Sequence, residues 1–193
     1  FQDAPSKLLG TYEEQLLPHL MPPGKTWESL FCIGAGDGYW AVGLKLKAVA
    51  KSVTAFEMNP DSQERIRELA KTNKVDIVVK GEAKSRELIE LAGSAGKDSL
   101  WIFDIEGAEF EIISEEFLRR ASPNTLVIEM HGTESDRTQF RERVQSFFDV
   151  TICRRADYKI DNLVTFFPSR LFEHEALLLL SEGRTGIAQE WLI

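Results

Sequence analysis

Residues 31 to 38 read Phe31-Cys32-Ile33-Gly34-Ala35-Gly36-Asp37-Gly38, a short apolar run that leads directly into three closely spaced glycines. The apolar run is typical of a buried strand, and glycines let the backbone turn sharply because they carry no Cβ. A segment with helical character, residues 39–47, follows at once. A strand, a glycine-rich turn and a helix in this order are typical of the point where a doubly wound α/β sheet binds a nucleotide-like ligand.

Further apolar runs, rich in β-branched residues, alternate with segments of helical periodicity. The runs are 30–33, 53–56, 75–79, 100–105 and 126–130, and the helical segments include 60–70, 85–91 and 109–120. This alternation predicts a parallel sheet, because each parallel connection needs a long crossover that packs on a sheet face. After residue 136 the pattern predicts a helix over 136–147, an antiparallel strand pair at 149–153 and 163–167, and a helix over 171–180.

The composition indicates one globular domain over residues 1–193, with a helical lead-in over 1–28, because 193 residues with 43% hydrophobic side chains suffice for a single core. A formal net charge of −8 disfavours nucleic acids and anionic membranes as partners. The longest aliphatic run, 176–180, is far too short to cross a bilayer. Cys32 and Cys153 lie in apolar runs, so we expect buried thiols and a reducing, cytoplasmic location. The sequence carries no signal for an oligomeric state.

The glycine spacing distinguishes between two kinds of ligand. A pyrophosphate-binding turn has the pattern G-x-G-x-x-G, which requires glycine at position 39, where this chain has Tyr39. The pattern here is G-x-G-x-G, which resembles the S-adenosylmethionine loop of class I methyltransferases. This resemblance implies that Gly34, Ala35, Gly36 and Gly38 contact S-adenosylmethionine. A nicotinamide-dependent oxidoreductase stays open as the alternative enzyme.

Residues at the ends of the next two predicted strands fit the same ligand. Glu57 follows Gly38 by about 20 residues, the separation expected for an acid that accepts hydrogen bonds from ribose hydroxyls. Met58 is placed next to it, where its side chain can pack on an adenine face. By resemblance to class I methyltransferases, Glu82 and Ala83 hold the adenine edge with a carboxylate and a backbone N–H.

The most specific string in the chain is Asp104-Ile105-Glu106-Gly107-Ala108-Glu109. It resembles the D-x-E-G-x-E signature of FkbM-type methyltransferases, and Glu129 and His131 match the E-x-H that ends the following strand in that family. The resemblance implies an α/β, Rossmann-like class I methyltransferase fold: a seven-stranded, mostly parallel sheet with a C-terminal antiparallel strand pair and helices on both faces. Two positions depart from the pattern. Class I enzymes usually carry an acid where this chain has Cys32, and FkbM-type loops commonly carry asparagine where it has Gly36.

Candidate catalytic groups lie just after two predicted strands. Asp104 is expected at the carboxyl end of a central strand, where ligands bind in open α/β sheets, and we predict that it contacts the cofactor. The alternation of side chains along a strand puts Glu106 on the same side. Methyl transfer to a hydroxyl needs an aligned acceptor and removal of the hydroxyl proton. His131 is the candidate base, with Glu106 as its rival or its partner.

These expectations combine into one predicted function, S-adenosylmethionine-dependent O-methylation of a hydroxyl on a small molecule or sugar. A noncatalytic cofactor-binding module is a second alternative. Asp104, Glu106, Glu129 and His131 can also hold magnesium or calcium, but no regular ligand spacing supports a metal site and none is predicted. Nine acids against two bases lie between residues 101 and 136, so a strongly anionic acceptor is not expected.

Overall fold

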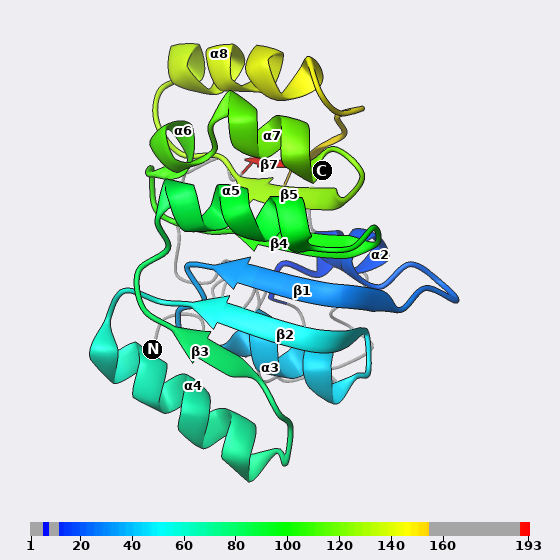
Figure 1. Ribbon diagram of the computed structural model, residues 1–193, viewed down its shortest axis with the longest axis vertical. Helices are drawn as coiled ribbons and strands as arrows, with labels where there is room; N and C mark the ends of the chain where they lie inside the picture. The colour runs from blue at the N-terminus through cyan, green and yellow to red at the C-terminus, as the bar shows by residue number, and fades with distance from the viewer. Residues whose placement is uncertain (1–5, 8–11, 155–189) are drawn as a thin grey trace, which may run out of the picture.

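The computed structural model describes residues 6–7, 12–154 and 190–193, and the strands of this part form one seven-stranded sheet (Figure 1). The strands are β1 (Trp27–Ile33), β2 (Ala50–Phe56), β3 (Val78–Lys80), β4 (Ser99–Phe103), β5 (Thr125–Glu129), β6 (Ile152–Arg154) and β7 (Glu190–Leu192). Their order across the sheet is β3-β2-β1-β4-β5-β7-β6. The first five are parallel, and β7 pairs antiparallel with β5 and with β6. The predicted seven-stranded, mostly parallel α/β sheet is confirmed.

Local sequence signals set the boundaries of the helices. The helices are η1 (Glu14–Leu16, a 3-10 helix), α2 (Leu17–Leu20), α3 (Tyr39–Leu46), α4 (Pro60–Thr72), α5 (Ser85–Ser94), α6 (Glu109–Ile112), α7 (Glu115–Ala121) and α8 (Glu134–Gln145). Asn59 begins α4 by accepting the backbone N–H groups of Asp61 and Ser62 on its side chain. Thr133 and Asp136 form a reciprocal capping box at the start of α8.

Two apolar cores cover the two faces of the sheet. Cys32 and Ile66 belong to the core under α2, α3 and α4, whereas Phe31, Trp101 and Leu118 belong to the core under α5, α7 and α8 (Figure 1). Neighbouring residues of β1 therefore point to opposite faces, as the strand period of two requires. The rings of Phe31 and Trp101 stack with centroids 4.1 Å apart across β1 and β4. This packing fixes the central strands whose carboxyl ends carry the predicted site.

Residues 109–120, predicted as one helix, form two. Helix α6 ends at Ile112, and Ile113 leaves the helical region with φ −88° and ψ 81°. Ser114 then begins α7, because its side-chain oxygen accepts the N–H of Phe117 at 3.2 Å. The prediction of a continuous helix was wrong because a serine inside a helical pattern also serves as an N-cap for a second helix.

The antiparallel pair at the C-terminus also differs from the prediction. Strand β6 overlaps the predicted strand 149–153, but the partner that the structure shows is β7, which the sequence pattern did not mark as a strand. Residues 163–167 and 171–180, predicted as a strand and a helix, lie outside the described residues. Strand β7 is only three residues long, and all three are buried. Such a short segment offers no alternation of polar and apolar residues from which a strand can be predicted.

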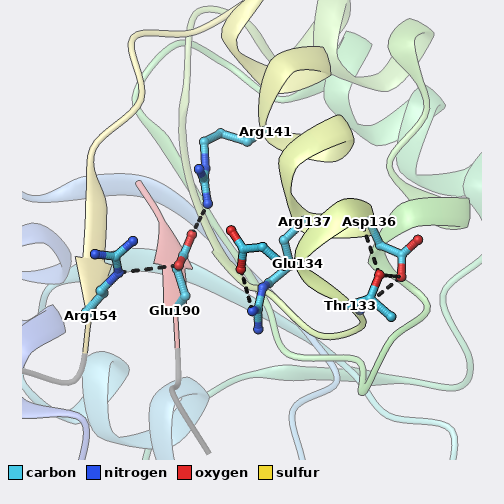
Figure 2. A network of polar contacts seen from close by, with 7 residues as sticks. All are labelled: Thr133, Glu134, Asp136, Arg137, Arg141, Arg154 and Glu190. Carbon is cyan, nitrogen blue, oxygen red and sulfur yellow. Dashed lines mark hydrogen bonds and ion pairs between the residues drawn. The ribbon is translucent and has the colours of Figure 1, made fainter.

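An ion-pair network joins β7 to its neighbours (Figure 2). The carboxylate of Glu190, at the start of β7, lies between Arg141 of α8 and Arg154 of β6. Glu190 is buried, and its backbone oxygen accepts the N–H of Met130 at 2.8 Å. A single residue thus links a helix and two strands.

Other expectations about the chain are met only in part. The helical lead-in is short where the structure describes it, since η1 and α2 end at Leu20 and β1 begins at Trp27. Trp27 Nε1 donates to the Leu20 oxygen at 2.9 Å, which fixes the lead-in against the sheet. Cys32 is buried as expected, Cys153 is half-buried, and both are free thiols. No helix in the described part of the chain is long and apolar enough to span a membrane.

Candidate active site

Two cavities open side by side at the carboxyl ends of the central strands. The chain runs outward from β1 to β3 in one direction and from β4 to β5 in the other, so ligands are expected between β1 and β4. The first cavity has a volume of about 310 Å³ and the second of about 340 Å³. Both are lined by the loop after β1 and by the end of β4, through Ile33, Gly34, Gly36, Asp104 and Glu106. The predicted glycine loop and Asp104 therefore lie together.

The glycines of the loop after β1 serve different purposes. A Cβ on Gly34 would lie 1.8 Å from the backbone oxygen of Asp104, so only glycine lets β1 and β4 approach this closely. Gly36 has no atom within 4 Å of the position of a Cβ, and its N–H donates to Glu57 at 2.8 Å. Ala35 lines the second cavity. Gly38 lines neither cavity, since it begins α3 and faces Ile66.

The first cavity contains the residues predicted to hold a nucleoside. Glu57 is buried at the end of β2, where one carboxylate oxygen accepts the N–H of Gly36 and the other accepts that of Asn59 at 2.9 Å. Each oxygen keeps a second lone pair for a ligand hydroxyl. Met58 is 73% exposed at the rim, and Glu82 and Ala83 also line the cavity. No lysine or arginine is among the described residues that line it, so these residues fit an uncharged nucleoside better than a phosphate.

Asp104 lies where the two cavities meet, directly after β4. Burial raises the pKa of Asp104 well above its ordinary value, and the hydrogen bond and negative charge of Glu129 raise it further. Asp104 therefore keeps a proton at pH values at which an exposed aspartate has lost its own. Its Oδ1 atom is buried and accepts no hydrogen bond within the part of the chain that the structure describes.

Glu106 and His131 come together beside Asp104. Glu106 lies on the same side as Asp104, as predicted, but strand alternation is not the reason, because β4 ends at Phe103. Glu106 instead sits in a left-handed turn, with φ 53°, and its Oε2 lies 3.4 Å from His131 Nε2. One carboxylate oxygen of Asp104, one of Glu106 and one ring nitrogen of His131 lie within 4.8 Å of one another. Glu129 Oε2 lies 3.9 Å from His131 Nε2. The four residues considered as metal donors are thus neighbours, and the absence of a bound metal stays a prediction.

Glu109 belongs to this cluster, although sequence reasoning gave it no role at the site beyond its match to the D-x-E-G-x-E signature. It is fully buried, and its carboxylate accepts the N–H of Gly107 at 2.9 Å and the N–H of His131 at 2.7 Å. His131 Nδ1 lies 3.1 Å from the same carboxylate. The signal that could have found it is its place as the third acid of the D-x-E-G-x-E string.

The electrostatics of the Glu109–His131 pair follow from these contacts. The hydrogen bond with Glu109 raises the pKa of His131 above its ordinary value, against the opposing effect of burial. Burial alone would raise the pKa of Glu109, but the hydrogen bonds from His131 and from the backbone lower it below its ordinary value. Glu109 is therefore ionised at neutral pH and stabilises a positive charge on His131.

Aromatic side chains form one wall of the second cavity, which sequence reasoning missed. Tyr12, Tyr39 and Trp40 line it, and the rings of Tyr12 and Tyr39 meet edge to face with centroids 5.2 Å apart. Lys7, at the rim, lies 2.7 Å from a carboxylate oxygen of Asp37. The adjacent Tyr39 and Trp40 after the glycines were the available signal, but nothing in the sequence indicates that Tyr12 reaches them.

Comparisons with known proteins bear on one segment of the sequence and on the fold. Residues 77–160 match the methyltransferase FkbM domain, a range that contains Glu82, Asp104, Glu106, Glu109 and His131. A comparison with curated proteins finds no match.

Among solved structures, TYW2 of M. jannaschii in complex with AdoMet has a TM-score of 0.54 and 18% identity, covering 95% of this chain and 74% of that chain. Sp1610 of Streptococcus pneumoniae in complex with S-adenosyl-L-methionine has a TM-score of 0.56 and 16% identity, covering 91% of this chain and 69% of that chain. Precorrin-6y C5,15-methyltransferase of Geobacter metallireducens has a TM-score of 0.51 and 16% identity, with 74% of each chain covered. At these identities the likeness shows the fold. The chain thus has the fold of class I methyltransferases, and its residues 77–160 match the methyltransferase FkbM domain.

Proposed function

We propose that this chain is an S-adenosylmethionine-dependent methyltransferase that transfers the methyl group to a hydroxyl of an uncharged small molecule or sugar. The observation that carries the proposal is the convergence of Asp104, Glu106 and His131 within 4.8 Å where two cavities meet. A hydroxyl placed there has a candidate base beside it, and the first cavity provides a separate place for the cofactor.

The first cavity supports the cofactor part of the proposal. S-adenosylmethionine supplies an electrophilic methyl group on sulfur when it is bound. The carboxylate of Glu57 would accept hydrogen bonds from the ribose hydroxyls, and Met58, Glu82 and Ala83 would enclose the adenine. Gly34, Ala35 and Gly36 bring the backbone of the loop to the junction of the cavities, close to Asp104. Gly38 would act only indirectly on the cofactor, by fixing the start of α3.

The groups after β4 and β5 support the acceptor part. Glu109 accepts at His131 Nδ1, which leaves the Nε2 lone pair directed toward Glu106. His131 Nε2 would take the proton of the acceptor hydroxyl, and Glu106 would accept a hydrogen bond from the acceptor and orient it. The aromatic wall of the second cavity, Tyr12, Tyr39 and Trp40, suits the apolar face of a sugar or aromatic ring.

Thermal unfolding in the presence of S-adenosylhomocysteine or NAD tests the cofactor first. At about 100 times its Kd, S-adenosylhomocysteine should stabilise the protein by ~2.7 kcal/mol and raise Tm by about 5 to 10 °C, whereas NAD should leave Tm unchanged. Glu57→Gln should lower the response to S-adenosylhomocysteine. Exposed Glu64 of α4 offers the matched control, Glu64→Gln, which should respond like the unmodified protein. A larger response to NAD would favour an oxidoreductase.

Transfer of a labelled methyl group from S-adenosylmethionine to a panel of sugars and phenols tests the reaction. We expect product with neutral hydroxyl acceptors and a loss of ~10² to 10⁴ in rate for His131→Ala, with S-adenosylhomocysteine affinity retained. Cofactor binding without transfer to any acceptor would contradict the proposal and favour a noncatalytic binding module. Methylation restricted to amines would contradict the hydroxyl assignment.

A further inference from the structure

We propose that Glu109 is a positioning residue that holds both Glu106 and His131 in the arrangement needed for methyl transfer. This inference rests on the proposed function, because it gives Glu109 a role only through the two residues that face the acceptor. Nothing in the match to the FkbM domain assigns that role.

Three donors converge on the carboxylate of Glu109. Two backbone N–H groups, of Gly107 and His131, and the ring nitrogen Nδ1 of His131 all lie within 3.1 Å of the Glu109 carboxylate. The oxygen Oε1 takes both His131 contacts and Oε2 takes that of Gly107. Only a carboxylate accepts on both oxygens, whereas glutamine would turn its NH₂ group toward one of the donors. Because Glu109 is fully buried, water cannot replace a lost partner.

Glu106 is presented by an unusual backbone turn after β4. Glu106 and Gly107 both have positive φ, 53° and 105°, and the first is an uncommon conformation for a residue with a Cβ. The N–H of Gly107 is held by Glu109 two residues later. This contact closes the turn between β4 and α6 and keeps the carboxylate of Glu106, whose side chain is 77% exposed, 3.4 Å from His131 Nε2.

The contact with Glu109 also determines the tautomer of the neutral His131 ring. An ionised Glu109 can only accept at Nδ1, so the neutral ring carries its proton on Nδ1 and a lone pair on Nε2. A base needs that lone pair free to receive the acceptor proton. The titratable groups that face the ring are Glu109 from α6, Glu106 from the turn, Glu129 from β5 and Asp104 from the end of β4. Of these, Glu109 makes the shortest contact with the ring.

The test compares Glu109→Gln and Glu109→Asp with Glu111→Gln, a matched control on the same helix whose side chain is exposed. For Glu109→Gln we expect kcat to fall by about 10²-fold, the size of effect expected for a misplaced catalytic group, with the Kd of S-adenosylhomocysteine unchanged. The acid limb of the pH profile should move to lower pH, because the hydrogen bond with Glu109 raises the pKa of His131. Glu109→Asp, which keeps the charge, should retain more of kcat, and Glu111→Gln should stay within about twofold of the unmodified enzyme.

Nitrogen-15 NMR of the His131 ring, with S-adenosylhomocysteine bound and no acceptor present, tests the same inference without turnover. We expect the Nδ1–H tautomer in the unmodified protein and a lower titration midpoint in Glu109→Gln. An Nε2–H tautomer, or a midpoint unchanged by the substitution, would overturn the inference. A loss of kcat without a shift of the acid limb of the pH profile would also overturn the inference.

If Glu109→Gln does not fold, Glu109→Asp and the tautomer of His131 in the unmodified protein test the inference instead. Failure of the proposed function can be told apart from failure of this inference. If the proposed function is wrong, no variant methylates any acceptor, but the tautomer of His131 can still be measured by NMR.

Discussion

Two glycines in the loop after β1 look equivalent in the sequence but face different surroundings. A Cβ on Gly34 would overlap the backbone oxygen of Asp104, at a φ of 78° that L side chains rarely adopt. A Cβ on Gly36 would meet nothing within 4 Å, and only its φ of 56° opposes a side chain. At Gly34 the requirement is close packing of two strand ends, and at Gly36 it is mainly backbone conformation.

Replacing each glycine with alanine should therefore give different losses of stability. For Gly34→Ala we expect a loss of about 2 to 5 kcal/mol, from the left-handed backbone and from overpacking against β4. For Gly36→Ala we expect about 1 to 2 kcal/mol, from the backbone alone. Urea unfolding at constant m value measures both. Equal losses for the two variants would show that the contact with Asp104 does not constrain the loop.

The sequence predicted which residues meet at the site better than it predicted how they meet. Asp104 and His131 follow neighbouring strands, and parallel strands present their carboxyl ends at one edge of the sheet, so their proximity was predictable. Glu106 reaches them through a left-handed turn, which no strand period indicates. Glu109 contacts His131 across 22 positions of the chain, and its burial depends on how the turn after β4 closes. Contacts of that kind arise from tertiary packing and leave no periodic pattern.

Among the elements, β7 is attached partly through one buried carboxylate, that of Glu190. Glu190 is buried, and its partner Arg141 has a side chain that is 18% exposed (Figure 2). Arg154, the other partner, is 67% exposed and stays solvated if the contact is lost. Because β7 joins β5 to β6, the attachment of the last two strands of the sheet rests partly on this carboxylate.

Substituting Glu190→Gln should therefore destabilise this edge of the sheet. We expect a loss of about 3 kcal/mol, because the substitution leaves the Arg141 guanidinium largely buried without its counter-charge. Hydrogen exchange should show faster opening of β6 and β7 than of β1 and β4. Glu134→Gln is the matched control. Glu134 forms an ion pair with Arg137 within α8, and its side chain is 69% exposed. Loss of this exposed ion pair should leave Tm almost unchanged. Similar effects of the two substitutions would contradict a special role for Glu190.

Strand and helix identities were predictable where the elements are long, and short elements were not. Strands β1, β2, β4 and β5 and helix α4 each carry five or more residues in a regular pattern, and Asn59 and Pro60 mark the helix start. The three-residue strand β3 was predicted because it lies at the end of a longer apolar run, 75–79. Strand β7 and the break between α6 and α7 depend on three residues and one serine cap, respectively. At that length the pairing partner and the cap geometry decide the structure, and both are properties of the folded chain.

At the scale of the whole molecule, the net charge of −8 is unevenly placed. Residues 101–136 hold nine acids and two bases, so most of the excess negative charge lies in this stretch. The structure divides these acids into two groups. Five are exposed on helices, namely Glu111, Glu115, Glu116, Glu134 and Asp136, whereas Asp104, Glu106, Glu109 and Glu129 surround His131. The ionised carboxylates of the second group make the potential at the proposed acceptor site negative, and this potential should act on any charged acceptor.

A neutral sugar should therefore bind more tightly than its phosphorylated counterpart to the protein saturated with S-adenosylhomocysteine. We expect a difference of about tenfold in Kd, equivalent to ~1.4 kcal/mol, which shrinks as salt screens the repulsion. Calorimetric competition at two salt concentrations measures it without requiring turnover. Glu106→Gln should reduce the difference because its carboxylate faces the site, and Glu111→Gln on the far side of the turn should not. Tighter binding of the phosphorylated sugar would mean that basic side chains, such as Lys7 and Arg65 at the second cavity, dominate acceptor recognition instead of the acids around His131.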